Sequence, residues 1–210
     1  TANNADVFER ADVIVLAVKP QVLCDVLKPL ALIAQAKKPL IISIAAGIPL
    51  ASIDRWLGGN MAIVRAMPNT PALVQTGATG LYANATVTRE QMQQAEMILN
   101  AVGLTLWVDD EALIDSVTAV SGSGPAYFFY VMEAMIAAGC ELGLDEKTAR
   151  ALTLQTALGS AQMAITADVS PAELRRRVTS KGGTTEQAIA AFDAADLKGI
   201  FSQALAACAA

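Results

Sequence analysis

The stretch from residue 178 to residue 187 carries the side chains best suited to chemistry, in the order Val-Thr-Ser-Lys-Gly-Gly-Thr-Thr-Glu-Gln. The pattern predicts the end of one helix, a turn and the start of another. Gly182 and Gly183 allow a positive φ and a close approach of a ligand to the backbone. Thr184 followed by Gln187 fits a capping box, which makes Thr184 the expected N-cap. Thr185 would then lie in the first helical turn with its hydroxyl free.

The start of that helix suits a carboxylate or phosphate group. The first N–H groups of a helix lack partners within it, and they lie at the positive end of the helix dipole. An ordinary turn between two helices explains the same residues, and on this stretch alone it is the favoured interpretation.

The chain contains no histidine. This excludes Ser-His-Asp and Cys-His nucleophilic sites, HExxH zinc sites and histidine general bases. Any chemistry must therefore use Thr, Ser, Lys, Tyr, Asp or Glu, or a bound cofactor. The three cysteines, Cys24, Cys140 and Cys208, are scattered. We therefore expect neither a metal site nor a disulfide framework, and a reducing cytoplasm fits.

The composition is that of a chain with much apolar surface to bury. Of 210 residues, 54% are hydrophobic and only 17% are charged, which suggests a large core and further burial against a second copy. The net charge of −5 argues against binding to nucleic acid or to an anionic membrane. The longest uncharged run, residues 39–53, is too short to span a bilayer, and we expect no signal peptide.

Strands and helices alternate in the first half of the chain. Short apolar runs rich in β-branched residues predict strands at 12–18, 40–44, 62–65, 78–82 and 105–108. The segments between them predict helices at 21–36 with a break at Pro29, at 49–57 and at 88–102. This alternation implies an α/β domain with a parallel sheet and crossover connections.

No strand pattern follows Asp109, so we expect a second, all-α domain from there to the end. Helices are predicted at 111–120, 125–142, 145–166, from Ser170, at 185–192 and from 196 onwards. The helix at 125–142 is apolar almost all round, which is typical of a helix buried on every side and here favours a subunit interface. The arginines 175–177 end a helix, where dipole compensation and solvent exposure explain them.

Ligands on open parallel sheets bind beyond the carboxyl ends of the strands. Three predicted strand ends carry small or turn residues that would let a flat cofactor lie against the backbone: Ala17-Val18-Lys19-Pro20, Ala45-Ala46-Gly47 and Met67-Pro68-Asn69-Thr70. Loops between strands and helices need turn residues anyway, so a purely structural role carries equal weight.

The run Gly122-Ser123-Gly124 looks like the start of a nucleotide-binding fingerprint but does not fit it. It follows a helical pattern rather than a strand, and Tyr127 occupies the position that needs glycine or alanine. We expect these glycines to allow helices or a substrate to approach closely.

Four motifs together resemble the pyrroline-5-carboxylate reductase family in order and spacing. They are Ala17-Val18-Lys19-Pro20, Met67-Pro68-Asn69-Thr70-Pro71, Ser121-Gly122-Ser123-Gly124-Pro125-Ala126-Tyr127 and Thr179-Ser180-Lys181-Gly182-Gly183-Thr184-Thr185. The resemblance covers essentially the whole chain. It implies a Rossmann-like dinucleotide-binding domain at 1–108 and a helical dimerisation and substrate-binding domain at 109–210. Family members often assemble further, into decamers.

The resemblance also implies a reaction, which is the reduction of 1-pyrroline-5-carboxylate to L-proline with NADPH, or in some members NADH. The residues that would face the cofactor are Asn4, Ala17, Val18, Lys19, Pro20, Ala45, Ala46, Gly47, Pro68 and Asn69. Those that would hold the substrate are Ser180, Gly182, Gly183, Thr184 and Thr185, with Thr185 as the catalytic residue. In the family, the active site lies between the nucleotide domain of one subunit and the helical domain of its partner.

The sequence departs from the family pattern in two ways. The family's opening strand, glycine fingerprint and following helix and strand, about 50 residues, are not found here. We therefore expect a fragment or an absent N-terminal segment, weak dinucleotide binding without it, and no basis for choosing NADPH over NADH. Lys181 stands where many members carry proline, which we expect to change loop stiffness rather than chemistry.

Two other functions stay open at this point. A β-hydroxyacid dehydrogenase would share the same domain plan, but its expected catalytic lysine has no counterpart in the settings of Lys147, Lys181 and Lys198. A non-catalytic helical dimerisation protein would explain the apolar helix but not the loop from Gly182 to Thr185.

Overall fold

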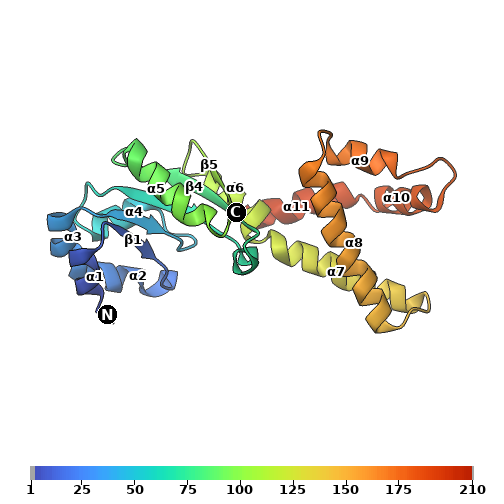
Figure 1. Ribbon diagram of the computed structural model, residues 1–210, viewed down its shortest axis with the longest axis horizontal. Coiled ribbons are helices and arrows are strands. Elements are labelled where there is room, and N and C mark those ends of the chain that lie inside the picture. Colours follow the sequence, from blue (N-terminus) through green and yellow to red (C-terminus); the bar gives the residue numbers. More distant parts are fainter. Residues whose placement is uncertain (1–2, 210) are drawn as a thin grey trace. The chain divides into compact units, whose positions relative to one another are not determined.

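The computed structural model describes residues 3–209 and divides into two compact units (Figure 1). Unit 1 comprises residues 1–125 with 208–210, and unit 2 comprises residues 126–207. Residues 109–125, which the sequence assigns to the helical domain, belong to the first compact unit. The boundary between functional domains after Val108 stays a prediction.

A five-stranded sheet in the order β1-β2-β3-β4-β5 forms the centre of unit 1. Its strands are β1 Val13–Leu16, β2 Leu40–Ser43, β3 Ile63–Met67, β4 Gly77–Ala83 and β5 Gly103–Trp107. β2 and β3 are buried on both faces, as is usual for the central strands of a parallel sheet. β1 is buried on one face only, because Ile14 and Leu16 are buried while Val15 is exposed. All five predicted strands are confirmed to within a few residues.

The direction of β4 corrects the prediction of a uniformly parallel sheet. β4 pairs antiparallel with β3, and β5 then pairs parallel with β4. The cause is the short connection: only the 3-10 turn η2, Thr70–Val74, lies between β3 and β4. A parallel neighbour needs a crossover of a dozen or more residues, whereas a short connection reverses the chain.

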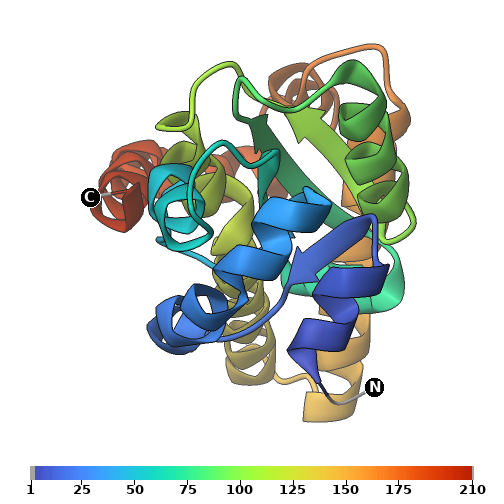
Figure 2. The ribbon, with the colours of Figure 1, turned by 90° about the vertical axis from the view of Figure 1, so that its left-hand side faces the viewer.

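Helices cover both faces of this sheet (Figure 2). One face packs against α1 Asn4–Arg10, α2 Pro20–Leu27, α3 Ala31–Lys37 and α4 Leu50–Trp56, and the other against α5 Arg89–Asn100. The predicted break at Pro29 is confirmed, because the 3-10 turn η1, Lys28–Leu30, separates α2 from α3. The helix α1 has no counterpart among the helices predicted from the sequence. The helix α6, Leu113–Val117, and the π-helical turn η3, Thr118–Gly122, follow β5 along the chain.

Unit 2 is built from helices alone. They are α7 Gly124–Glu141, α8 Glu146–Thr166, α9 Pro171–Arg177, α10 Thr184–Ala194 and α11 Leu197–Ala209, the first and last of which extend into the residues of unit 1. The exposed positions of Arg176 and Arg177, which pair with Glu173, agree with the surface role predicted for the arginines. None of the helices formed by residues 3–209 has the length and apolar character needed to cross a membrane.

The apolar helix α7 is not buried within the single chain. Phe128, Phe129 and Tyr130 are 68%, 62% and 72% exposed. Among the described residues of unit 2, only Ala149 and Thr153 are buried. The single chain does not bury this helix, and the subunit interface predicted for it stays a prediction.

Candidate active site

The carboxyl ends of β1, β2 and β3 lie along one edge of the sheet, because the three strands are parallel neighbours. The first two predicted cofactor loops offer exposed backbone there: Ala17, Val18 and Lys19 after β1, and Ala46 and Gly47 after β2, are all exposed. Pro20, Pro68 and Asn69 are half-buried, Ala45 is buried, and Asn4 is exposed as the first residue of α1. The fold thus brings the three loops to one edge.

The loop after β2 is anchored at both ends and open in the middle. The buried Ser43 accepts a hydrogen bond from the Ala45 amide through its Oγ, at 3.3 Å. At the other end, the Leu50 amide donates to Glu111 Oε1 at 2.8 Å. Between them Gly47 has a φ of +71°, and a Cβ placed on it would meet nothing within 4 Å. A flat ligand could therefore lie against this backbone.

The loop after β3 is hydrogen-bonded to the segment Ser121–Gly124. Asn69 Oδ1 accepts from the Ala78 amide at 2.9 Å, and Asn69 Nδ2 donates to the Ser121 carbonyl at 3.0 Å. The Met67 methyl lies so close to Gly122 that an added Cβ would approach it to 2.7 Å. Gly122 therefore permits close packing of η3 against β3, as expected, and the side chain of Asn69 holds this part of the fold together.

The predicted capping box at Thr184 is wrong. Gly183 is the N-cap of α10, with φ −84° and ψ 169°, and Thr184 is already the first helical residue. Gly182 alone of the two glycines takes a positive φ, +74°. The Gln187 amide donates to the Gly183 carbonyl at 3.4 Å rather than to a threonine hydroxyl.

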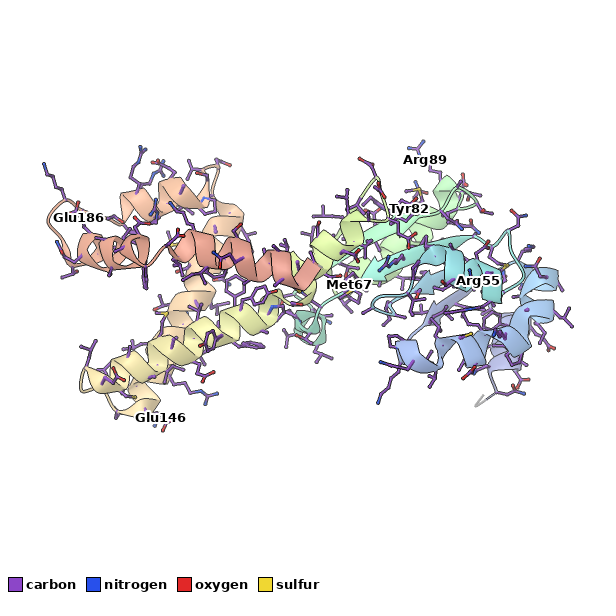
Figure 3. All side chains as sticks on the ribbon, turned by 180° about the vertical axis from the view of Figure 1, so that it is seen from behind. Arg55, Met67, Tyr82, Arg89, Glu146 and Glu186 are labelled. Carbon is purple, nitrogen blue, oxygen red and sulfur yellow. The ribbon has the colours of Figure 1, made fainter. Side chains whose placement is uncertain are left out.

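Glu186 explains why the cap differs from the prediction. Its carboxylate Oε2 accepts from the Gly182 amide at 2.7 Å, so an acid in the first turn reaches back to the loop. Figure 3 labels Glu186 at this end of α10, where the loop from α9 meets the helix. The acid also lies at the positive end of the helix dipole, which stabilises it there.

The amides left for an anion are those of the first three residues of α10. The Gly182 amide is bound to Glu186, and the Gly183 amide donates to the Ser180 carbonyl at 3.0 Å. The amides of Thr184, Thr185 and Glu186 precede the first intrahelical hydrogen bond of α10, so all three lie in the turn whose donors have no helical acceptor. Thr185 is half-buried and Thr184 exposed.

The buried Arg65 forms an ion pair with the half-buried Glu111, which the sequence did not predict. Arg65 Nη1 lies 3.0 Å from Glu111 Oε1, and the Arg65 side chain is only 8% exposed. An arginine within the apolar run of β3 was the available signal, because buried arginine needs a partner. The partner, 46 residues further along the chain, could not be identified from that signal.

A mostly parallel open sheet with helices on both faces places unit 1 in the Rossmann-like class of α/β folds. A family model described as NADP oxidoreductase coenzyme F420-dependent matches residues 1–47. A second, described as pyrroline-5-carboxylate reductase dimerisation, matches residues 111–210.

Curated relatives and solved structures agree with these matches. The pyrroline-5-carboxylate reductase of Pseudomonas aeruginosa is 59% identical over 97% of this chain and 74% of its own length. A pyrroline-5-carboxylate reductase structure from Coxiella burnetii is 48% identical, with a TM-score of 0.95 over 100% of this chain and 77% of its own. The Plasmodium falciparum pyrroline carboxylate reductase, solved with NADP bound, is 30% identical with a TM-score of 0.90 over 100% of this chain and 79% of its own. The chain belongs to the pyrroline-5-carboxylate reductase family.

Proposed function

We propose that this protein reduces 1-pyrroline-5-carboxylate to L-proline by hydride transfer from NAD(P)H, as the last step of proline biosynthesis in the cytoplasm. The observation that carries the proposal is the loop from Ser180 to Thr185, in a chain of this family. It leaves the amides of Thr184, Thr185 and Glu186 and the Thr185 hydroxyl available at the start of α10. Family membership favours this function over a β-hydroxyacid dehydrogenase or a non-catalytic dimerisation protein.

The cofactor would be held at the carboxyl edge of the sheet in unit 1. A flat group could lie against the exposed residues of the first two loops, Ala17 and Val18 and then Ala46 and Gly47. The exposed Lys19 offers a cation for a phosphate. Asn4, Pro20, Ala45, Pro68 and Asn69 complete the proposed cofactor set. Reduced nicotinamide, when bound, supplies the hydride; we propose NADPH as the cofactor, with NADH as a possible substitute.

The substrate carboxylate would bind the amides of Thr184 and Thr185. These two donors point out of the first turn of α10, where the helix dipole also favours a negative charge. Ser180, Gly182 and Gly183 shape the loop through the bonds from Gly182 to Glu186 and from Gly183 to Ser180. The loop therefore positions the substrate mainly through backbone groups.

The Thr185 hydroxyl would hydrogen-bond the ring nitrogen and so orient the imine carbon, which is C2 of the substrate and becomes C5 of proline, toward the hydride donor. A cyclic imine takes up a proton from water near neutral pH, and its protonated form is the better hydride acceptor. The protein must then supply position more than strong acid catalysis, which fits a chain without histidine. Because a threonine hydroxyl is a weak acid, we assign Thr185 to orientation or proton relay.

A homo-oligomer is expected to form through the C-terminal helices. The apolar side chains of α7, including Phe128 and Phe129, are exposed in the single chain, and the matching family model is that of a dimerisation region. We propose that α7 from two copies covers this surface, with decamers as the family's further assembly.

NADPH oxidation by the full-length natural protein with pyrroline-5-carboxylate tests the function, with NADH measured alongside. Saturable turnover to proline, identified by mass spectrometry, is the expected result and ranks the two cofactors. A folded full-length protein without turnover on either cofactor would end the reductase proposal.

A further inference from the structure

We propose that Glu111, held by Arg65, is a positioning residue for the cofactor, because it fixes the loop after β2 from outside the sheet. The inference rests on the proposed function, since it concerns the loop that would face NAD(P)H. It identifies two residues behind the loop, Glu111 and Arg65, that neither the sequence motifs nor the exposed strand ends indicate.

Arg65 provides the fixed point of this arrangement. It lies on β3 in register with Ser43 of β2 and Tyr82 of β4, so its backbone is held on both sides by the sheet. Its guanidinium contacts Glu111 Oε1 at 3.0 Å and Asp115 Oδ1 at 3.7 Å. A charge this deeply buried is costly unless it is paired, so the arginine binds Glu111 in one preferred geometry.

Glu111 uses the same oxygen to cap helix α4. The N-cap residue of α4 is Pro49, whose side chain makes no capping hydrogen bond. The first helical amide, that of Leu50, donates instead to Glu111 Oε1 at 2.8 Å, across 61 residues of sequence. Because the cap comes from a distant segment, the position of the α4 start depends on where the arginine holds Glu111.

The start of α4 is also the end of the cofactor loop. Ser43 fixes the beginning of the loop through the Ala45 amide, and Glu111 fixes its end at Leu50. Ala46 and Gly47 lie exposed between these anchors, and Gly47 has the positive φ of +71° that sharply turns the chain. If the hydrogen bond from Leu50 to Glu111 is lost, the exposed backbone at Gly47, three residues before Leu50, loses its defined position.

Glu111 is also the first residue matched by the dimerisation family model. The segment that begins the helical region of the family thus shapes a loop of the nucleotide-binding sheet. The cofactor's affinity should therefore depend on a residue that follows the last strand and reaches the loop through one hydrogen bond.

The experiment compares Glu111→Ala and Glu111→Gln in the full-length enzyme. Alanine removes both the partner of Arg65 and the cap of Leu50, and we expect KM for NADPH to rise about tenfold while KM for pyrroline-5-carboxylate changes less than about twofold. Glutamine keeps an oxygen that can accept from Leu50 but loses the charge, so a smaller rise is expected. The control is Asp12→Asn, which removes the ion pair with Lys37 before β1 and should leave both KM values unchanged.

The split between the two KM values separates positioning from a purely structural role. A fall in Tm with both KM values unchanged, or with both raised equally, would overturn the proposal. If the alanine variant does not fold by circular dichroism, the glutamine variant decides by the same criterion. If the wild-type enzyme shows no turnover, the proposed function fails, and NADPH affinity by fluorescence titration then tests Glu111 separately, with a loss in Glu111→Ala supporting it and no change overturning it.

Discussion

The two units of the chain differ in how much of their own apolar surface they bury. Unit 1 encloses its sheet in two clusters of buried aliphatic side chains, one on each face. Among the described residues of unit 2, only Ala149 and Thr153 are buried, while Phe128, Phe129 and Tyr130 of α7 are exposed. Unit 1 thus buries its apolar surface within one chain, whereas unit 2 exposes apolar surface that the proposed dimer would cover.

This difference also separates the two halves of the proposed chemistry. The cofactor loops follow strands of a packed sheet, and their anchors, Ser43 and Glu111, belong to unit 1. The substrate loop lies between short helices in the unit with little core, and it is shaped locally by Glu186. Substitutions in the two units should therefore differ in whether their effects depend on protein concentration.

Phe128→Glu should produce the largest effect by preventing assembly. The new carboxylate would be placed without a partner in the surface that two copies cover, at a cost of several kcal/mol in each copy. Analytical ultracentrifugation should show monomers at concentrations where the wild-type protein is oligomeric. The matched control is Leu32→Glu, at a position 86% exposed on α3 of unit 1, which should leave assembly intact. Equal oligomerisation of both variants would contradict the role of α7.

Leu27→Ala should lower the free energy of unfolding of unit 1 by about 2–5 kcal/mol at every protein concentration, because the side chain is fully buried in the core of a single chain.

Leu158→Ala, at a half-exposed position on α8, should lower the free energy of unfolding by less than about 0.5 kcal/mol in dilute solution. Its cost should grow where assembly covers α8. Urea denaturation at two widely separated protein concentrations measures both; a concentration-independent cost at Leu158 would argue that unit 2 is stable alone.

Thr185→Ala should lower kcat by roughly 10- to 1000-fold, a loss of about 1.4–4 kcal/mol of transition-state stabilisation. In the proposed mechanism the hydroxyl orients the imine, and the variant keeps the amides proposed to bind the carboxylate, so KM for the substrate should change less. The control is Thr166→Ala, whose hydroxyl bonds the Gln162 carbonyl of its own helix at 2.9 Å. Steady-state rates that are unchanged in Thr185→Ala would remove this residue from the mechanism.

Acid should weaken one exposed carboxylate contact in each unit, with a small effect. Hydrogen bonds from the Thr148 side chain and amide hold the pKa of Asp145 below its usual value at the N-cap of α8. A hydrogen bond and ion pair with Lys37 likewise lower the pKa of Asp12 in unit 1. A carboxylate whose pKa is lower in the folded than in the unfolded state stabilises the folded state at pH values above its unfolded pKa. Both contributions to stability should therefore be lost progressively as the pH falls below about 4.

Thermal melts of Asp145→Asn and Asp12→Asn test this pH dependence. Each variant should have a slightly lower Tm than the wild type at pH 7, and the difference should shrink below pH 4. A difference that stays constant down to low pH would show that the carboxylate charge is not the cause.

The sequence predicted most of this fold because its signals are local. Apolar β-branched runs gave the five strands, Pro29 gave the break between α2 and α3, and Thr88 gave the start of α5, where it forms a capping box with Gln91. The alternation of elements does not reveal the reversal at β4, whose signal lies in the short connection that contains Pro68 and Pro71. The direction of a strand depends on the length and path of its connection, which the pattern of the strand itself does not show.

The candidate site was predictable in outline but not in its hydrogen bonds. The three strand-end loops and the turn at Gly182 were visible as motifs. The choice of Gly183 over Thr184 as N-cap depends on Glu186 reaching back to Gly182, which competes with the capping box. The contact between Arg65 and Glu111 spans 46 residues, so only the folded chain brings these two charges together.

The exposed face of α7 also has a consequence for how the sequence can change over generations. In a two-fold dimer each patch meets the same patch of its partner, so one inherited substitution enters the interface twice. A poor fit is then doubled at once, and a compensating change is doubled as well. In the proposed dimer, a substitution at Phe128 would therefore be selected for its effect on both copies of α7 at once.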